Sequence, residues 1–325
     1  MRRRDFIAGA GSVALWPPPA ARAQTNGSKK VGLFLIGAVP PIRDLEIVKE
    51  LAKLGDVDGR NVTYVVVGDD TGEASRWPRL VGEMVAAKPD VVVGAGSNLS
   101  YAFAAATRDI PIVFTAVADP VATGLSDSLS RPTKTSTGFT ISTLSIVAKR
   151  LEILRELVPN LNKVGHLWVP DNPLGHASEE QAQSAAKSLG IEIVSLPLKT
   201  SVDIEPAFAI ADKEHVEAIL PDPDPINVQF DATIADECQI RNMPLMDAWP
   251  SQIQNGALAA YGPPSIENFK GAANYVDRIL KGAKVADLPF VEPTELKLAI
   301  NLKTARSIGV TVPANLLALA DDVVE

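Results

Sequence analysis

The sequence predicts an α/β protein made of two similar lobes, each a doubly wound parallel sheet, joined by a hinge of three chain crossings. Buried strands alternate with amphipathic helices, and this pattern repeats at a fixed offset along the chain. The chain has 325 residues, a length that suggests two domains at about 100–200 residues each. Its 46% hydrophobic and 22% charged residues are typical of a globular protein and exclude a disordered or fibrous one.

The first half of the mature chain alternates between apolar runs and amphipathic segments. Apolar runs of this length are typical of buried parallel strands. The expected strands are 31–36, 62–67, 91–93 and 112–114, and the expected helices are 43–54, 74–87 and 101–107. Gly55 stands at a helix C-cap position, and Ser97 is expected to N-cap the third helix. This order predicts a parallel sheet with helices on both faces.

The second half repeats this order at an offset of 133 residues. Lys30-Val31-Gly32 recurs as Lys163-Val164-Gly165, and the stretch from Arg108 recurs from Arg241. Further strands are expected at 191–196 and 216–220, and helices at 204–213 and 226–241. The tail is too short for a third lobe, so its helix 266–280 returns to the first lobe and its strand 296–300 to the second. The predicted lobes are therefore residues 29–139 with 263–290, and residues 140–262 with 291–325.

The first 23 residues have the features of an export signal. Arg2-Arg3-Arg4 precedes a short apolar stretch, and Ala21-Arg22-Ala23 has the pattern of a cleavage site. The paired arginines followed by Phe6-Ile7 resemble the twin-arginine type. The apolar stretch is shorter than the roughly 20 residues that span a bilayer. We therefore expect cleavage near Ala23 and a periplasmic mature protein without a lipid anchor.

Several classes of function are excluded by residues that the chain lacks. The net charge of −8 without a basic run argues against nucleic acid as a partner. Cys238 is the one cysteine, and His166, His176 and His215 are scattered, so neither a disulfide nor a metal site is expected. Gly94 to Leu99 lacks the third glycine of a dinucleotide motif. No nucleophile–base pair is evident, so we expect no cofactor and no catalytic residue.

Polar loops follow the predicted strands in both lobes, where open α/β sheets bind ligands. A helix start favours a carboxylate, an aspartate can hold an ammonium group, and an aromatic ring can stack on an apolar substituent. These loops predict a ligand cleft between the lobes. The candidate ligand-binding residues are Gly96, Ser97, Asn98, Thr115, Ala116, Asp119, Asn172, Pro173, Asp222, Trp249 and Tyr261.

Short segments in a specific order and spacing also carry a family likeness over nearly the whole mature chain. They are 118–121, 124–125, 130–132, 137–138, 148–152, 154–159, 172–173, 261–263, 278–283, 287–289, 293–294 and 300–305. Together they resemble the substrate-binding proteins of ABC transporters, in the group that includes tryptophan- and tyrosine-type binders. The resemblance implies the type I periplasmic-binding fold, with Ser97, Asp119, Asn172 and Asp222 at ligand-loop positions.

Two departures from that family leave the ligand open. The first loop, Gly37 to Pro41, carries no hydroxyl where relatives often place a serine, and the run Asp222-Pro223-Asp224-Pro225 is unusual. We expect a monomer that captures a small organic solute, an amino acid or an aromatic or carboxylate compound, and delivers it to a membrane permease. The alternatives are a ligand-sensing module for a membrane receptor and an exported α/β enzyme.

Overall fold

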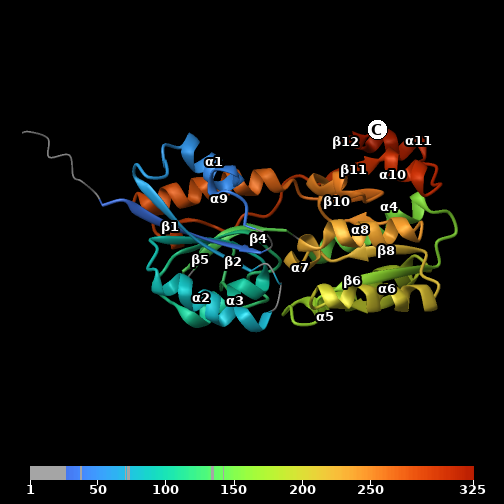
Figure 1. The fold of residues 1–325 in the computed structure, drawn as a ribbon, viewed down its shortest axis with the longest axis horizontal. Coiled ribbons are helices and arrows are strands. Elements are labelled where there is room, and N and C mark those ends of the chain that lie inside the picture. The colour runs from blue at the N-terminus through green and yellow to red at the C-terminus, as the bar shows by residue number, and fades with distance from the viewer. Residues whose placement is uncertain (1–26, 37–38, 70, 72–73, 133–134, 142) are drawn as a thin grey trace, which may run out of the picture.

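The computed structural model describes residues 27–36, 39–69, 71, 74–132, 135–141 and 143–325. The expected signal peptide, residues 1–23, and the loop residues Gly37 and Ala38 lie outside this part of the chain. The described residues form an α/β fold of two lobes, each a twisted sheet covered by helices (Figure 1).

Lobe 1 contains a five-stranded parallel sheet in the order β2-β1-β3-β4-β5. The strands are β1 (Lys29–Ile36), β2 (Val62–Asp69), β3 (Val91–Ala95), β4 (Ile112–Val117) and β5 (Ser136–Thr140). The first four lie where the apolar runs predict them. The fifth was not predicted, because its sequence STGFT is mostly polar or glycine.

Helices cover both faces of the lobe 1 sheet, as Figure 1 shows. They are α1 (Glu46–Lys53), α2 (Trp77–Ala86), α3 (Ser97–Ala106) and α9 (Ser265–Leu280). Successive residues of a strand point to opposite faces. Leu33 of β1 therefore packs in a core cluster with Ile47 of α1 and Val276 of α9. Its neighbour Phe34 packs with Trp77 of α2 and Phe103 of α3.

Lobe 2 contains a second sheet built from two ladders. One has the order β7-β6-β8 and the other β12-β11-β10-β9, and a bridge between Ile219 and Leu245 joins them. The strands are β6 (Lys163–Trp168), β7 (Glu192–Pro197), β8 (Ala218–Pro221), β9 (Met246–Asp247), β10 (Ala259–Gly262), β11 (Lys297–Asn301) and β12 (Asp322–Val324). This sheet is not wholly parallel. Strand β11 runs antiparallel to β10, because the chain returns from lobe 1 before it enters the sheet.

Helices also lie on both faces of the lobe 2 sheet. They are α4 (Thr143–Leu157), α5 (Gly175–Ser188), α6 (Ile204–Lys213), α7 (Pro225–Gln229), α8 (Asp231–Ile240), α10 (Leu302–Ser307) and α11 (Ala314–Leu319). Leu151 of α4 and Ala182 of α5 pack in one core cluster, and Phe208 of α6 and Ile234 of α8 pack in another. The expected single helix 226–241 is wrong, since the chain leaves the helical conformation at Phe230 between α7 and α8.

The glycine that recurs in the first strand of each lobe is required for the same structural reason. Gly32 and Gly165 occupy equivalent positions in β1 and β6, the first strand of each half. A Cβ atom on Gly32 would lie 2.5 Å from the sulfur of Met84, and one on Gly165 would lie 2.6 Å from a methyl group of Leu196. Each glycine therefore allows a core side chain to lie directly against the strand.

The chain passes between the lobes after β5, after β10, and between α9 and β11. Helix α9 packs against α1, so the tail contributes a helix to lobe 1 and a strand to lobe 2. The third passage runs beside β5. Thr137 Oγ1 donates to the Leu288 carbonyl at 2.6 Å, and Val291 pairs with Phe139. The predicted residue boundaries of the two lobes stay a prediction.

Candidate ligand-binding cleft

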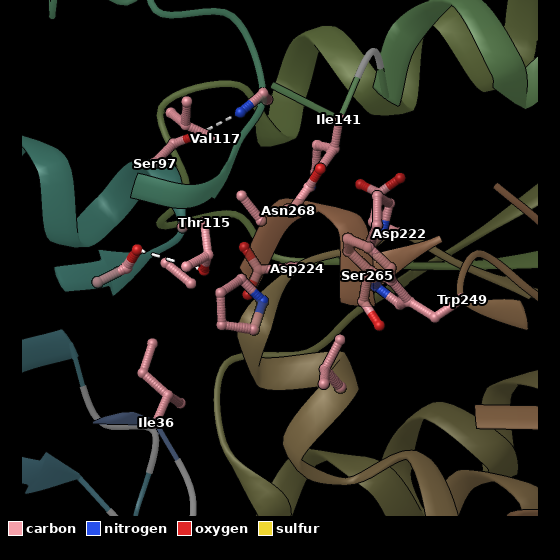
Figure 2. Close-up of a pocket in the computed structure, with 18 of the residues that line it drawn as sticks. Ile36, Ser97, Thr115, Val117, Ile141, Asp222, Asp224, Trp249, Ser265 and Asn268 are labelled. Carbon is pink, nitrogen blue, oxygen red and sulfur yellow. Dashed lines mark hydrogen bonds between the residues drawn. The ribbon is translucent and has the colours of Figure 1, made fainter. Parts of the chain in front are cut away.

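A cavity of about 340 Å³ lies between the two lobes, at the carboxyl ends of their strands. One wall comes from β1, β3, β4 and the start of α3, and the other from the segments that follow β6, β8 and β9. The first residues of α9 complete it (Figure 2). Small-molecule pockets have volumes of about 300–1,000 Å³, so this cavity has the size and the place of a binding site for a small solute.

The wall from lobe 1 begins where β3 turns into α3. Ser97 was expected to be the N-cap, and this is wrong: it is the first helical residue, and Gly96 is the N-cap with φ +89. Glycine adopts this conformation without strain, so the helix starts at the cavity itself. Ser97 Oγ accepts a hydrogen bond from the Ala118 N–H at 3.4 Å. The start of α3 therefore presents backbone donors and the positive end of its dipole, which favour an anion.

The wall from lobe 2 contains a buried carboxylate at Asp224, which follows β8. One oxygen of Asp224 accepts a hydrogen bond from the Ile226 N–H at 2.8 Å and so caps α7. The other accepts from Asn172 Nδ2 at 2.6 Å. Burial raises the pKa of Asp224 to about 6, although both hydrogen bonds act in the opposite direction. The cleft thus holds a carboxylate whose charge is poorly compensated.

Asp222, two residues earlier, belongs to a buried network of charges. Its Oδ1 lies 3.0 Å from His166 Nε2 and accepts a hydrogen bond from Ser178 Oγ at 2.6 Å. His166 Nδ1 lies 2.5 Å from Glu179 Oε2. Burial alone would lower the pKa of His166, but Asp222 and Glu179 outweigh it and raise this pKa to about 9. His166 is therefore an imidazolium at neutral pH, held between two carboxylates.

Arg150 of α4 adds a second buried cation behind this network. Its side chain is fully buried, and Nη1 donates to the Pro221 carbonyl at 2.9 Å. Against the effect of burial, His166, Ser178 and Arg150 hold the pKa of Asp222 below its usual range. Two cations thus offset the charges of Asp222 and Glu179. Asp222 contributes to the cleft as an ionised, ion-paired acceptor in a fixed position.

Most of the remaining lining is apolar. It includes Phe34, Ile36, Val117, Ile141, Val169, Leu174, Val228 and Phe269. Figure 2 shows the indole ring of Trp249 among the side chains that surround this space. Asp247 holds the backbone at this tryptophan, since its Oδ1 accepts from the backbone N–H of Trp249 at 3.0 Å. Such a surface suits an apolar or aromatic group.

Three buried polar atoms of the lining have no hydrogen-bond partner within the described part of the chain. They are Trp249 Nε1, Gln252 Oε1 and Asn268 Nδ2. An unsatisfied buried polar group costs about 1–3 kcal/mol. A ligand that presents acceptors and a donor to these atoms therefore gains affinity from them.

The two lobes touch across the cleft. A Cβ atom on Gly96 of lobe 1 would lie 2.6 Å from Cγ of Pro225 in lobe 2, so only glycine fits against this proline. The contact places the start of α3 next to the residue that follows Asp224. A donor-rich helix start and a carboxylate therefore lie within reach of one small molecule.

The structure brings together seven of the predicted ligand residues. Those that line the cavity are Gly96, Ser97, Thr115, Ala116, Asn172, Asp222 and Trp249. Four others are not part of the described lining: Asn98, Asp119, Pro173 and Tyr261. The carboxylate of Asp119 instead accepts from the N–H groups of Val121 and Ala122, at 3.0 and 2.9 Å. It closes a local turn rather than facing the cleft.

Two residues that matter for the cleft were not singled out from the sequence: His166, which lies behind Asp222, and Asp224, which is part of the lining. From the sequence, His166 was named only as one of three scattered histidines, and its place in the apolar strand KVGHLW was the available signal for a buried partner. Asp224 precedes a proline in the same way as Asp119, so no local feature distinguished the two. Asn268, from the first turns of α9, joins the lining only because the tail returns to lobe 1.

The grouping of Ser178, Asp222 and His166 does not have the geometry of an activated nucleophile. Ser178 donates its proton to Asp222, and a protonated His166 has no free ring nitrogen to accept one. Among the described residues, no group of three or more histidine, cysteine, aspartate or glutamate side chains has the arrangement of a metal site. No helix in this part of the chain has the length and apolar character to span a membrane.

Two lobes with parallel strands in this order, joined by three chain crossings beside a solute-sized cleft, have the type I periplasmic-binding fold. The model of the ABC transporter substrate binding protein family matches residues 47–324. The chain therefore belongs to this family, whose members bind solutes.

Individual relatives support the same assignment. The chain is 24% identical over 289 residues to the Tyrosine-binding protein of Clostridioides difficile (strain R20291), covering 88% of this chain and 83% of that one. It is 27% identical to a conserved domain protein from Vibrio cholerae, with a TM-score of 0.82 and coverage of 91% and 100%. It is also similar to an ABC domain from Streptococcus pneumonia in complex with L-Trp, at 23% identity, a TM-score of 0.81 and coverage of 92% and 100%.

Proposed function

We propose that this protein captures a free amino acid with an apolar or aromatic side chain and delivers it to the permease of an ABC importer. The observation that carries the proposal is the cleft itself, which combines a donor-rich helix start, a buried carboxylate and an apolar wall. The likeness to a tyrosine-binding protein and to a domain that holds L-Trp supports the same ligand class.

In this proposal each end of the zwitterion has a partner. The carboxylate lies at the start of α3, beside Ser97, where backbone N–H groups favour an anion. The ammonium group pairs with Asp224, which lies next to the proline that touches Gly96. The side chain packs on the apolar wall and on Trp249. Better contacts in the closed arrangement then shift the two lobes toward closure around the ligand.

We also propose that the protein is exported and that it releases its ligand to the permease. Residues 1–23 act as a twin-arginine signal, cleavage near Ala23 leaves a monomeric periplasmic protein, and the ligand-bound form docks on the membrane permease. Uptake by cells that lack this protein tests delivery directly. Loss of uptake supports transport, whereas normal uptake with loss of a ligand response supports the sensing role.

The first experiment identifies the ligand. The purified mature protein is analysed by native mass spectrometry, stripped of bound small molecules, and titrated by calorimetry with L-tryptophan, L-tyrosine, L-phenylalanine and L-leucine. We expect saturable one-to-one binding of at least one of them, and recovery of that compound unaltered. Binding of none of these amino acids contradicts the proposed ligand class, and chemical conversion of the bound compound contradicts the transport role.

A further inference from the structure

Asp224 differs from the other carboxylate of the cleft in the charges that surround it. Asp222 is ion-paired with His166 at 3.0 Å. Asp224 is only 4% exposed, and its hydrogen-bond donors, Asn172 and the Ile226 N–H, are neutral. Burial of a carboxylate without a counter-charge is costly. Its charge state therefore depends on what lies next to it in the cleft.

No cation faces Asp224 from the elements packed around it, as far as the structure describes them. The described lining holds two ionisable side chains, Asp222 and Asp224, and the nearby Asp222 repels an ionised Asp224. The lining residues from lobe 1, from α7 and from α9 are uncharged. On α5, Glu179 is held by His166, and on β9 Asp247 shares a hydrogen bond with Asp231.

We propose that Asp224 selects ligands by the charge of the substituent it faces, and that this selection reverses with pH. The inference rests on the proposed function, because it takes an α-amino acid as the ligand. The ionised carboxylate pairs with an α-ammonium group. The protonated carboxyl group instead accommodates an uncharged α-hydroxyl group at the same place, where an ionised carboxylate has no counter-charge.

The two ligand types move the Asp224 proton in opposite directions. An ammonium ligand that binds the protonated form releases the proton to solvent, and an α-hydroxy ligand that binds the ionised form takes one up. Because the pKa of Asp224 is about 6, its ionised fraction falls about tenfold between pH 7 and pH 5. The affinity for an α-amino acid should therefore fall about tenfold over this range, and that for its α-hydroxy counterpart should rise about tenfold.

Calorimetry on the stripped mature protein tests this directly. The probes are L-tryptophan and L-indole-3-lactate, with L-tyrosine and its α-hydroxy counterpart as a second pair. All keep an ionised carboxylate across this range. We expect affinities that change with pH in opposite directions within each pair. At about pH 6, titrations in buffers of different ionisation enthalpy should show about half a proton released with the amino acid and about half taken up with the hydroxy acid.

Two variants assign the effect to one residue. Asp224→Asn keeps the shape of the side chain and should abolish both pH dependences and both proton transfers. Asp171→Asn is the matched control, because Asp171 lies in the neighbouring loop, pairs with Lys199 at 2.9 Å and is outside the described lining. It should behave as the wild type.

The outcomes separate this inference from the proposed function. Amino-acid binding whose pH dependence survives in Asp224→Asn overturns the role of Asp224 and leaves the proposed function intact. The same holds if both ligands of a pair change affinity in the same direction. Binding of none of L-tryptophan, L-tyrosine, L-phenylalanine and L-leucine at any pH overturns both proposals.

Discussion

Replacing His166 with glutamine tests whether a buried imidazolium holds lobe 2 together. Its ring contacts Asp222 at 3.0 Å and Glu179 at 2.5 Å, and the histidine is fully buried. The variant His166→Gln leaves two carboxylates in the interior without their shared cation. Removing one partner of a buried ion pair costs about 3–5 kcal/mol. We expect the free energy of unfolding at neutral pH to fall by about this amount.

The same contacts make the stability of the wild type depend on pH. The pKa of His166 is about 9 in the folded protein, against an ordinary value of 6.5. This difference corresponds to about 3 kcal/mol of stability. Because the folded-state value is the higher one, this contribution is fully present below pH 6.5, declines as the pH rises toward 9, and is lost above it.

Urea unfolding followed by circular dichroism measures both effects. The free energy of unfolding is determined between about pH 6 and pH 9.5 for the wild type, for His166→Gln and for the control His176→Gln. The control makes the same substitution at an exposed histidine of α5. We expect the wild type and the control to lose stability over this range, and His166→Gln to lose less. A wild-type value that stays constant across the range contradicts a buried imidazolium between Asp222 and Glu179.

Three further changes test the cleft and the core. Gly96→Ala should weaken ligand binding about tenfold by calorimetry, because the added Cβ would lie 2.6 Å from Cγ of Pro225. The control Gly124→Ala is also at positive φ, but its Cβ would have no atom within 4 Å, so it should bind normally. Equal affinities of the two variants would argue against the cross-lobe contact. Trp249→Phe keeps an aromatic ring but loses the indole N–H, and it should weaken binding about fivefold, the value of one hydrogen bond. Unchanged affinity would place that N–H away from the ligand. Cys238 is 2% exposed, and burial raises the pKa of its thiol, so it should resist alkylation until the protein unfolds; rapid labelling of the native protein would contradict this.

The order of strands and helices was largely predictable because it follows from local pattern. A parallel strand covered on both faces must be apolar where it is buried, as residues 31–36 of β1 and the whole of β3 are, and such runs are visible in sequence. Strand β5 was missed for the opposite reason. Its residues are mostly small or polar, and it is a strand because it pairs with β4 and because Thr137 donates to the carbonyl of Leu288, 151 residues away.

The contrast between Asp119 and Asp224 shows why the site was only partly predictable. Each aspartate follows a strand and precedes a proline. The carboxylate of Asp119 accepts hydrogen bonds from its own turn, while Asp224 lies in the wall of the cavity. The segments that follow β3, β4, β6, β8 and β9 border the cavity, as the rule for strand ends predicts. The direction of each side chain depends on backbone geometry that residue type does not specify.

Two repeated α/β halves with polar loops at one edge were predictable from the amino-acid sequence, because strand burial, helix periodicity and strand-end position are local properties. Which charges are paired and which face the cleft without a counter-charge follows from the folded arrangement of the chain. His166 meets Asp222 across 56 residues of chain, and Gly96 meets Pro225 from the other lobe. Electrostatic energies in an interior depend on such distances and on burial, which exist only once the two lobes have folded and met.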